Sequence, residues 1–213
     1  MDYGSPTQSL GSSRVKKIIA VVVGSLVVVG AGAALWLVLD SSAVAATVGK
    51  SKITENQIKS SVNQIIAERK TVSTTGMQLA FGAALNAEEV NFYILSKLLA
   101  DTAAANNITL SEADVTAREA VILKQEGSAA KLKTGMVSAS IASDDFPGYV
   151  HEILYVDALT KLVEKNGTSV ANSGTAVQSL VRQQALKEGV KVSAKYGTWD
   201  PTQVTVTPPT TTN

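Results

Sequence analysis

Residues 85–99, LNAEEVNFYILSKLL, predict a long amphipathic helix and, with it, a helical fold. Asn86 is expected to cap the start of this helix, with Glu89 at its third position, and Asn106 to stand at its end. Its apolar side chains recur at the spacing of one helix face: Val90, Ile94, Leu95, Leu98 and Leu99. Such a face is stable only when other elements cover it, so the neighbouring segments should supply further helices.

The segments on both sides carry helix signals of their own. A helix from Thr54 to about Lys70 begins with a capping box, because Gln57 lies three residues after Thr54. Residues 71–86 are interrupted by two glycines and fit either a loop or a broken helix. Further helices are predicted at residues 111–127, 128 to about 134, about 144–165 and 175–187.

Short strands are expected at the two ends of the helical region. Residues 46–53 fit a strand or hairpin with Gly49 at the turn, and Val190, Val192 and Tyr196 alternate as in a strand. Pairing the two ends would satisfy backbone groups that isolated strands leave without partners. The predicted fold class is therefore mainly α, a helical bundle closed by a short two-stranded β pairing of its N- and C-terminal ends.

This domain is expected to span residues 44–201. The remaining residues, 202–213, are rich in threonine and proline and are predicted to be a disordered tail.

An uncharged, mostly aliphatic run at residues 18–39 follows three cations, Arg14, Lys16 and Lys17. At ~1.5 Å per residue a helix here would reach roughly 33 Å, enough to cross a hydrocarbon core of about 30 Å. The positive-inside rule then places residues 1–17 in the cytoplasm as a short tail. The sequence thus predicts a single-pass protein of the cell membrane, anchored in the lipid bilayer through residues 18–39, with its main domain extracytoplasmic.

A cleaved signal peptide is the competing interpretation of the same segment. Residues 43–45, Ala-Val-Ala, resemble a cleavage site, but the apolar run is longer than the ~7–15 residues usual for a signal core. Cleavage there would also cut into the first predicted strand. We therefore expect a retained anchor, and the topology is the same in both cases.

Composition and motifs argue against catalysis. The chain has 19 basic and 18 acidic residues, no cysteine and one histidine, His151, so nucleic-acid binding, thiol chemistry and the usual zinc sites are disfavoured. Nucleotide-binding and hydrolase motifs are absent from the sequence. The acidic pairs at residues 88–89 and 144–145 are expected in first turns of helices, where they complement the helix dipole. The sequence predicts no enzyme, no cofactor and no metal site.

Two glycine-interrupted stretches, residues 76–85 and 135–149, place apolar and aromatic side chains outside the regular helix faces. Methionine and mobile aromatic side chains suit surfaces that adapt to varied apolar partners. The alternative is that they fold back onto the core. The candidate polypeptide-binding residues, which should then be at least partly exposed, are Met77, Leu79, Phe81, Met136, Phe146 and Tyr149.

The order of elements resembles the N-terminal chaperone domain of SurA- and PrsA-type extracytoplasmic folding factors. The resemblance rests on AATVGKSKIT at residues 45–54, NNITLSEADV at 106–115 and VKVSAKYGTWDP at 190–201, and covers about residues 44–201. Full-length members carry an inserted parvulin-type prolyl isomerase domain, for which residues 166–174 leave no room here. The resemblance therefore implies a chaperone-like fold and a polypeptide-binding role without isomerase residues.

Two functions are consistent with these observations. The first is a membrane-anchored extracytoplasmic chaperone-like domain that binds non-native or extended polypeptides during secretion or envelope assembly. The second is a dedicated structural or accessory subunit of a membrane or secretion complex that recognises a single membrane-protein partner. A general chaperone should suppress aggregation of unrelated proteins, whereas a dedicated subunit should copurify with one.

Overall fold

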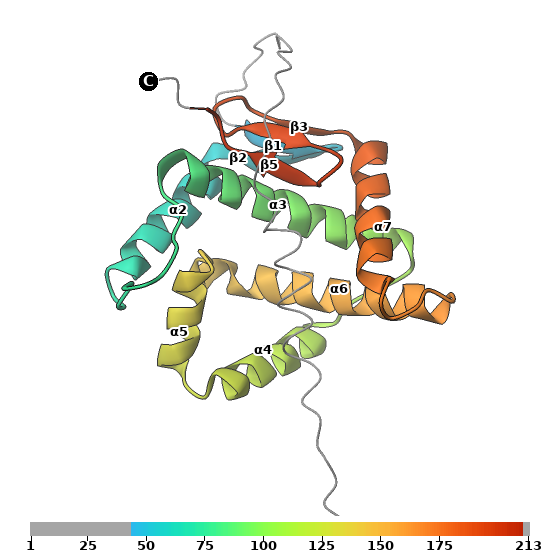
Figure 1. Ribbon diagram of the computed structural model, residues 1–213, viewed down its shortest axis with the longest axis horizontal. Helices are drawn as coiled ribbons and strands as arrows, with labels where there is room; N and C mark the ends of the chain where they lie inside the picture. The colour runs from blue at the N-terminus through green and yellow to red at the C-terminus, as the bar shows by residue number, and fades with distance from the viewer. Residues whose placement is uncertain (1–43, 211–213) are drawn as a thin grey trace, which may run out of the picture.

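A computed structural model describes residues 44–210, which form six α-helices and two small antiparallel sheets (Figure 1). The elements follow in the order β1 (Val44–Val48), β2 (Ser51–Thr54), α2 (Glu55–Arg69), α3 (Gly82–Ala105), α4 (Glu112–Glu126), α5 (Ala129–Ser138), the 3-10 turn η1 (Ser143–Asp145), α6 (Phe146–Lys165), α7 (Ser173–Glu188), β3 (Val190–Val192), β4 (Thr198–Asp200) and β5 (Thr205–Thr207). The mainly helical class predicted from the sequence is confirmed.

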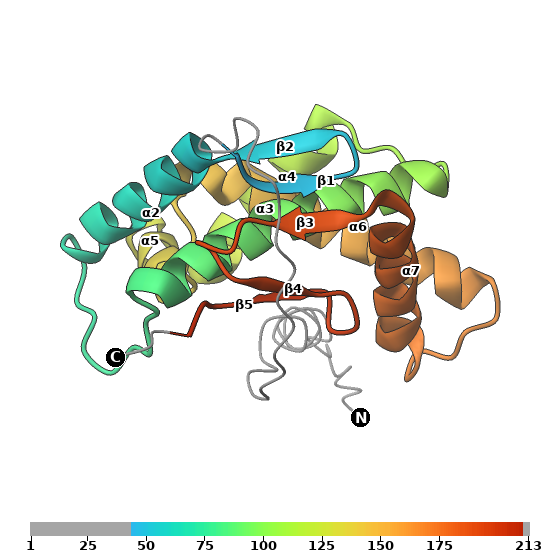
Figure 2. The ribbon, with the colours of Figure 1, turned by 90° about the horizontal axis from the view of Figure 1, so that it is seen from above.

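Helix α3 is the centre of the domain. The sheet of β1, β2 and β3 covers one side of it, and α6 runs along the other (Figures 1 and 2). The apolar stripe expected for this helix is buried, with Val90, Ile94 and Leu98 fully withdrawn from solvent. Leu159 of α6 and Val181 of α7 belong to the same core. The α4–α5 pair lies beyond α6, and Val115 is the one buried residue of α4.

The two ends of the domain pair, as the sequence predicts. Strand β1 lies between β2 and β3, antiparallel to both, with Ala46 opposite Val192 and Val48 opposite Val190. The sheet is three-stranded, because the turn at Gly49 adds β2 as a hairpin partner. Tyr196 is not part of the last strand; it is buried in the turn that follows, where its N–H donates to the carbonyl of Ser193.

The chain remains ordered beyond residue 201, so the prediction of a disordered tail from residue 202 is wrong for the residues that form β5. Strand β5 pairs antiparallel with β4, and Val204 and Val206 are buried. The Val206 N–H donates to Oδ1 of Asn91 on α3, at 3.0 Å. At Gly197 a Cβ would lie 2.1 Å from the carbonyl oxygen of Thr207, so only glycine fits where β4 begins.

The helix ends that are capped by side chains lie where the sequence predicts them. Thr54 and Ser111 both form capping boxes, and Gly127 ends α4 in a left-handed conformation. Helix α3 begins at Gly82 rather than at Asn86, and Phe81 stands at its N-cap position without a side-chain hydrogen bond. The helix near residue 130 also continues through Gly135 to Ser138. Gly135 lies inside α5, where glycine lowers the helix propensity but does not end the helix, whereas Gly82 begins α3 with a positive φ of 55°.

The predicted cytoplasmic tail and membrane span, residues 1–17 and 18–39, lie outside the described residues, as do residues 211–213. Among residues 44–210, no helix combines the length and apolar character needed to cross a bilayer.

Candidate functional site

The six residues predicted to bind polypeptide are all at least partly exposed. Phe81 is 66% exposed, and the others are half-buried. They lie on three segments: Met77, Leu79 and Phe81 between α2 and α3, Met136 on α5, and Phe146 and Tyr149 at the start of α6. All six residues thus meet the condition of partial exposure, and their role in binding stays a prediction. Burial raises the pKa of the Tyr149 hydroxyl.

Arg69 holds two of these segments together. Its guanidinium carbon lies 5.0 Å from the centre of the Phe81 ring. Nη1 donates to the carbonyl oxygen of Ala80 at 2.6 Å, and Nη2 donates to Oγ of Ser140 at 2.9 Å. Ser140 follows α5, so a single side chain from the end of α2 fixes the segment that carries Phe81 next to the end of the helix that carries Met136. The planar guanidinium can do this because it donates in several directions at once.

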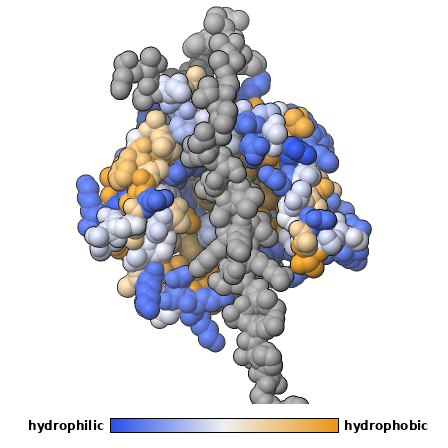
Figure 3. All heavy atoms as spheres, viewed as in Figure 1, coloured by the Kyte–Doolittle hydropathy of each residue, from blue (hydrophilic) through white to orange (hydrophobic). Residues whose placement is uncertain are grey.

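We call Met77, Leu79, Phe81 and Met136, the partly exposed apolar residues on the two segments that Arg69 joins, the Phe81 surface. In the view of Figure 3, hydrophobic residues gather on the side of the molecule where α2 and the start of α3 lie in Figure 1. Ile66 of α2 is a further exposed apolar residue. Phe146 and Tyr149 lie on α6, which is joined to α2 through the polar network described next.

That network is a group of acids and hydroxyls between α2, α3 and η1. Ser61 Oγ contacts Oε2 of Glu89 and lies 2.6 Å from Oδ2 of Asp145. The Tyr93 hydroxyl donates to Oδ1 of Asp145 at 2.6 Å. Glu89 is only 4% exposed, and burial is the main cause that raises its pKa to about 7. Burial and the hydrogen bond to Asp145 raise the pKa of Tyr93.

The positions of these acids correct the sequence interpretation. Because α3 begins at Gly82, Glu89 lies in the second turn and is buried instead of capping a helix end. Asp145 precedes α6 but makes no capping hydrogen bond; it accepts from Ser61 and Tyr93 instead. Both acids therefore join elements, and the helix dipole does not account for them.

A second carboxylic acid lies farther along the contact between α3 and α6. Glu152 Oε1 accepts from the Ser96 hydroxyl at 2.5 Å. Burial raises the pKa of Glu152 to about 8, although the hydrogen bond from Ser96 opposes the shift. Glu89 and Glu152 thus both favour the neutral form at mildly acidic pH.

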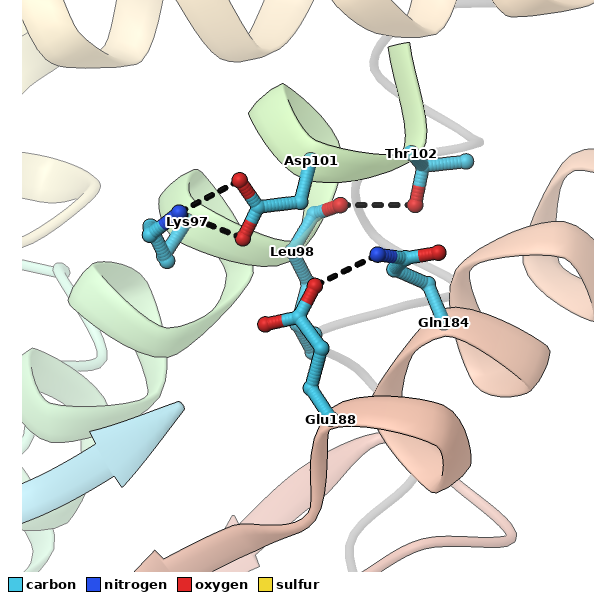
Figure 4. Close-up of polar contacts among 6 residues, drawn as sticks. All are labelled: Lys97, Leu98, Asp101, Thr102, Gln184 and Glu188. Atoms are coloured by element: carbon cyan, nitrogen blue, oxygen red, sulfur yellow. Dashed lines mark hydrogen bonds and ion pairs between the residues drawn. The ribbon is translucent and has the colours of Figure 1, made fainter. Parts of the chain in front are cut away.

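An open cleft of about 360 Å³ lies elsewhere, between α3, α7 and the β1–β2 turn. Figure 4 shows four of its polar side chains: Lys97 contacts Asp101 on α3, and Gln184 donates to Glu188 on α7. Each of these contacts joins residues of one helix. The cleft is lined by polar and charged side chains of both signs, of which Lys97 and Asp101 form an ion pair.

Residues 44–210 contain no group of side chains suited to metal binding. No group of three or more histidine, aspartate or glutamate side chains in this part of the chain could hold a metal ion. Nδ1 of His151 lies 2.9 Å from the carbonyl oxygen of Pro147, one turn earlier in α6.

Replacing Arg69 by alanine is expected to loosen the Phe81 surface. The substitution removes two hydrogen bonds of Arg69, a residue that is 8% exposed, so the free energy of unfolding should fall by about 2–3 kcal/mol. Amide hydrogen exchange of residues 71–81 should accelerate. Arg69→Lys keeps the charge but lacks the planar guanidinium. Its exchange rates in residues 71–81 should lie between those of wild type and Arg69→Ala. Unchanged exchange in Arg69→Ala would show that the segment is held by other contacts.

Comparisons of the chain with family models, with curated proteins and with solved structures give no match.

Proposed function

We propose that the protein is a membrane-tethered, extracytoplasmic domain that binds non-native or extended polypeptides through the Phe81 surface. The observation that carries this proposal is Phe81 itself, a large aromatic side chain that is 66% exposed and is held in place by Arg69. Burying that ring against a partner would remove a large apolar area from water. An aromatic side chain fixed before binding also loses little conformational freedom when a partner arrives.

The surrounding chemistry favours a partner of variable sequence. Met77 and Met136, two residues of the Phe81 surface, have flexible, polarizable side chains that can repack around different apolar groups. Binding would be passive: an extended segment lays apolar side chains against Phe81, and release follows from modest affinity.

The proposed relationship to SurA- and PrsA-type chaperone domains fits this role. The connection between α6 and α7, residues 166–172, is too short to contain an isomerase domain, so the activity proposed is binding alone. The proposed anchor at residues 18–39 would keep the binding surface at the outer face of the membrane, where secreted chains emerge.

Phe81→Ala is expected to weaken polypeptide binding much more than it destabilises the fold. Loss of an aromatic anchor should raise the Kd about tenfold or more. The exposed side chain should cost less than about 1 kcal/mol of folding stability. The measurement is fluorescence anisotropy of a labelled, reduced and carboxymethylated protein titrated with the detergent-solubilised full-length chain.

Leu186→Ala is the matched control, because Leu186 on α7 is 65% exposed and lies away from the Phe81 surface. It should leave the Kd unchanged. Equal binding by wild type and Phe81→Ala would contradict the proposal. If no unrelated unfolded chain binds and one membrane protein copurifies, the dedicated-subunit hypothesis is supported instead.

A further inference from the structure

Proton counting in the Ser61 network favours a state in which one carboxyl group is protonated. The Ser61 hydroxyl has a single hydrogen, yet its oxygen contacts carboxylate oxygens of both Glu89 and Asp145. If both acids were ionised, Ser61 could donate to only one, and the other would face an oxygen lone pair. If Glu89 is neutral, it donates to Ser61 Oγ and Ser61 donates to Asp145 Oδ2. All three groups are then satisfied.

Glu89 is the acid that carries the proton. It is almost completely buried, whereas Asp145 is half-buried and already accepts from the Tyr93 hydroxyl. Charged and titratable groups face Glu89 from each element packed around it, namely Arg69 on α2, Glu88 and Tyr93 on α3, and Asp145 on η1. Burial is the largest cause and raises the pKa of Glu89, and the charges of Asp145 and Glu88 raise it further. The hydrogen bond with Ser61 and the charge of Arg69 lower it, and the balance holds the pKa at about 7.

The network fastens a segment that borders the proposed binding surface. Residues 139–145 connect α5 to α6, and we call them the α5–α6 connection. Besides the contact between Ser61 and Asp145, Arg69 donates to Ser140, and the Ser143 N–H donates to Oε1 of Glu68 at 3.2 Å. Movement of this connection would change the positions of Met136 and Phe146 relative to Phe81.

We propose that the contact of Glu89, Ser61 and Asp145 is a proton-operated clamp that holds the α5–α6 connection against α2 and α3 at acidic pH and loosens it at alkaline pH. When Glu89 loses its proton, two negative carboxylates flank one hydroxyl, and Glu89 itself is buried. The repulsion is relieved when Asp145 moves away with η1 and lets water reach Glu89. This device concerns the free protein and does not depend on the proposed polypeptide binding.

Linkage gives the size of the effect. If Glu89 titrates at about 7 when the clamp is closed and at its ordinary 4.5 when it is open, the opening constant rises about 25-fold between pH 5.5 and pH 8. The test is amide hydrogen exchange of the α5–α6 connection in the full-length chain at these two pH values, corrected for intrinsic exchange rates. Informative amides include those of Ser143 and Asp145, which donate to Glu68 and to the Ala142 carbonyl.

Glu89→Gln separates the clamp from other pH effects. The amide can donate to Ser61 without titrating, so exchange in this variant should be the same at both pH values after correction. Glu112→Gln, an exposed position in the first turn of α4, is the matched control and should keep the pH dependence of wild type. The clamp is refuted if wild type shows no pH dependence, or if Glu89→Gln retains it.

A second measurement covers the case in which Glu89→Gln does not fold. Carbon-13 NMR follows the titration of the Glu89 carboxyl directly, in wild type and in Asp145→Asn. Removing the negative charge of Asp145 should move the titration midpoint of Glu89 below its wild-type position. An unchanged midpoint would show that the two acids are not coupled and would overturn the clamp.

Discussion

Deletion of residues 190–213 is expected to unfold the domain at 25 °C. The deletion removes β3, which pairs with β1, and it removes the buried side chains of Tyr196, Val204 and Val206. Loss of each buried side chain typically costs about 2–4 kcal/mol, and their sum is comparable with the whole stability of a domain, about 5–15 kcal/mol. The expected result is loss of the cooperative thermal transition measured by circular dichroism.

Two shorter deletions should have smaller effects on the melting temperature. Removal of residues 208–213, which follow β5, should leave the melting temperature unchanged. Removal of residues 202–213 should lower it clearly, because β4 loses its partner and Asn91 loses the Val206 N–H. A protein lacking residues 190–213 that melts at the parent temperature would contradict the β1–β3 closure of the fold.

Stability is expected to fall as the pH rises from about 4.5 to 8. Glu89 and Glu152 have folded-state pKa values of about 7 and about 8, above the ordinary value of 4.5. In this range the folded protein binds more protons than the unfolded chain, so the stabilisation is complete below pH 4.5 and is lost as the pH passes the folded pKa values. For Glu89 the loss is on the order of 3 kcal/mol.

Urea denaturation of the full-length chain at a series of pH values measures this dependence. Glu152→Gln should flatten the upper part of the profile, since the neutral amide keeps a partner for Ser96 and does not titrate. Glu89→Gln should flatten the part near pH 7. The control is Glu112→Gln, which should follow the wild-type curve. Stability that rises between pH 5 and 8 in wild type would show that these two acids are ionised in the folded protein.

Local signals in the sequence predicted local structure well. The capping boxes at Thr54 and Ser111 depend on residues three positions apart, so the sequence alone contains all of their partners. The predicted start of α3 at Asn86 is wrong. Asn86 is a good cap in isolation, but Leu85 and Ala87 pack in the interior and the helix begins at Gly82.

Long-range contacts account for what the sequence could not predict. Ser61 lies 28 positions from Glu89 and 84 positions from Asp145. Each of the three is an ordinary polar residue within its own segment. Strand β5 is ordered because Val206 meets Asn91 of α3, 115 positions away, and its Thr-rich composition alone suggested disorder. The exposure of the Phe81 surface could be anticipated because its residues fall outside the regular helix faces.

Site-specific photo-crosslinking shows whether Phe81 contacts a bound polypeptide. Benzoyl-phenylalanine would replace Phe81 in one protein and Leu186 in another, since the two side chains are equally exposed. Each full-length chain is irradiated with a labelled, carboxymethylated unfolded protein, with and without an excess of unlabelled competitor. We expect a crosslinked adduct from position 81 that the unlabelled competitor suppresses, and no adduct from position 186. No adduct from position 81, or equal adducts from both positions, would contradict it.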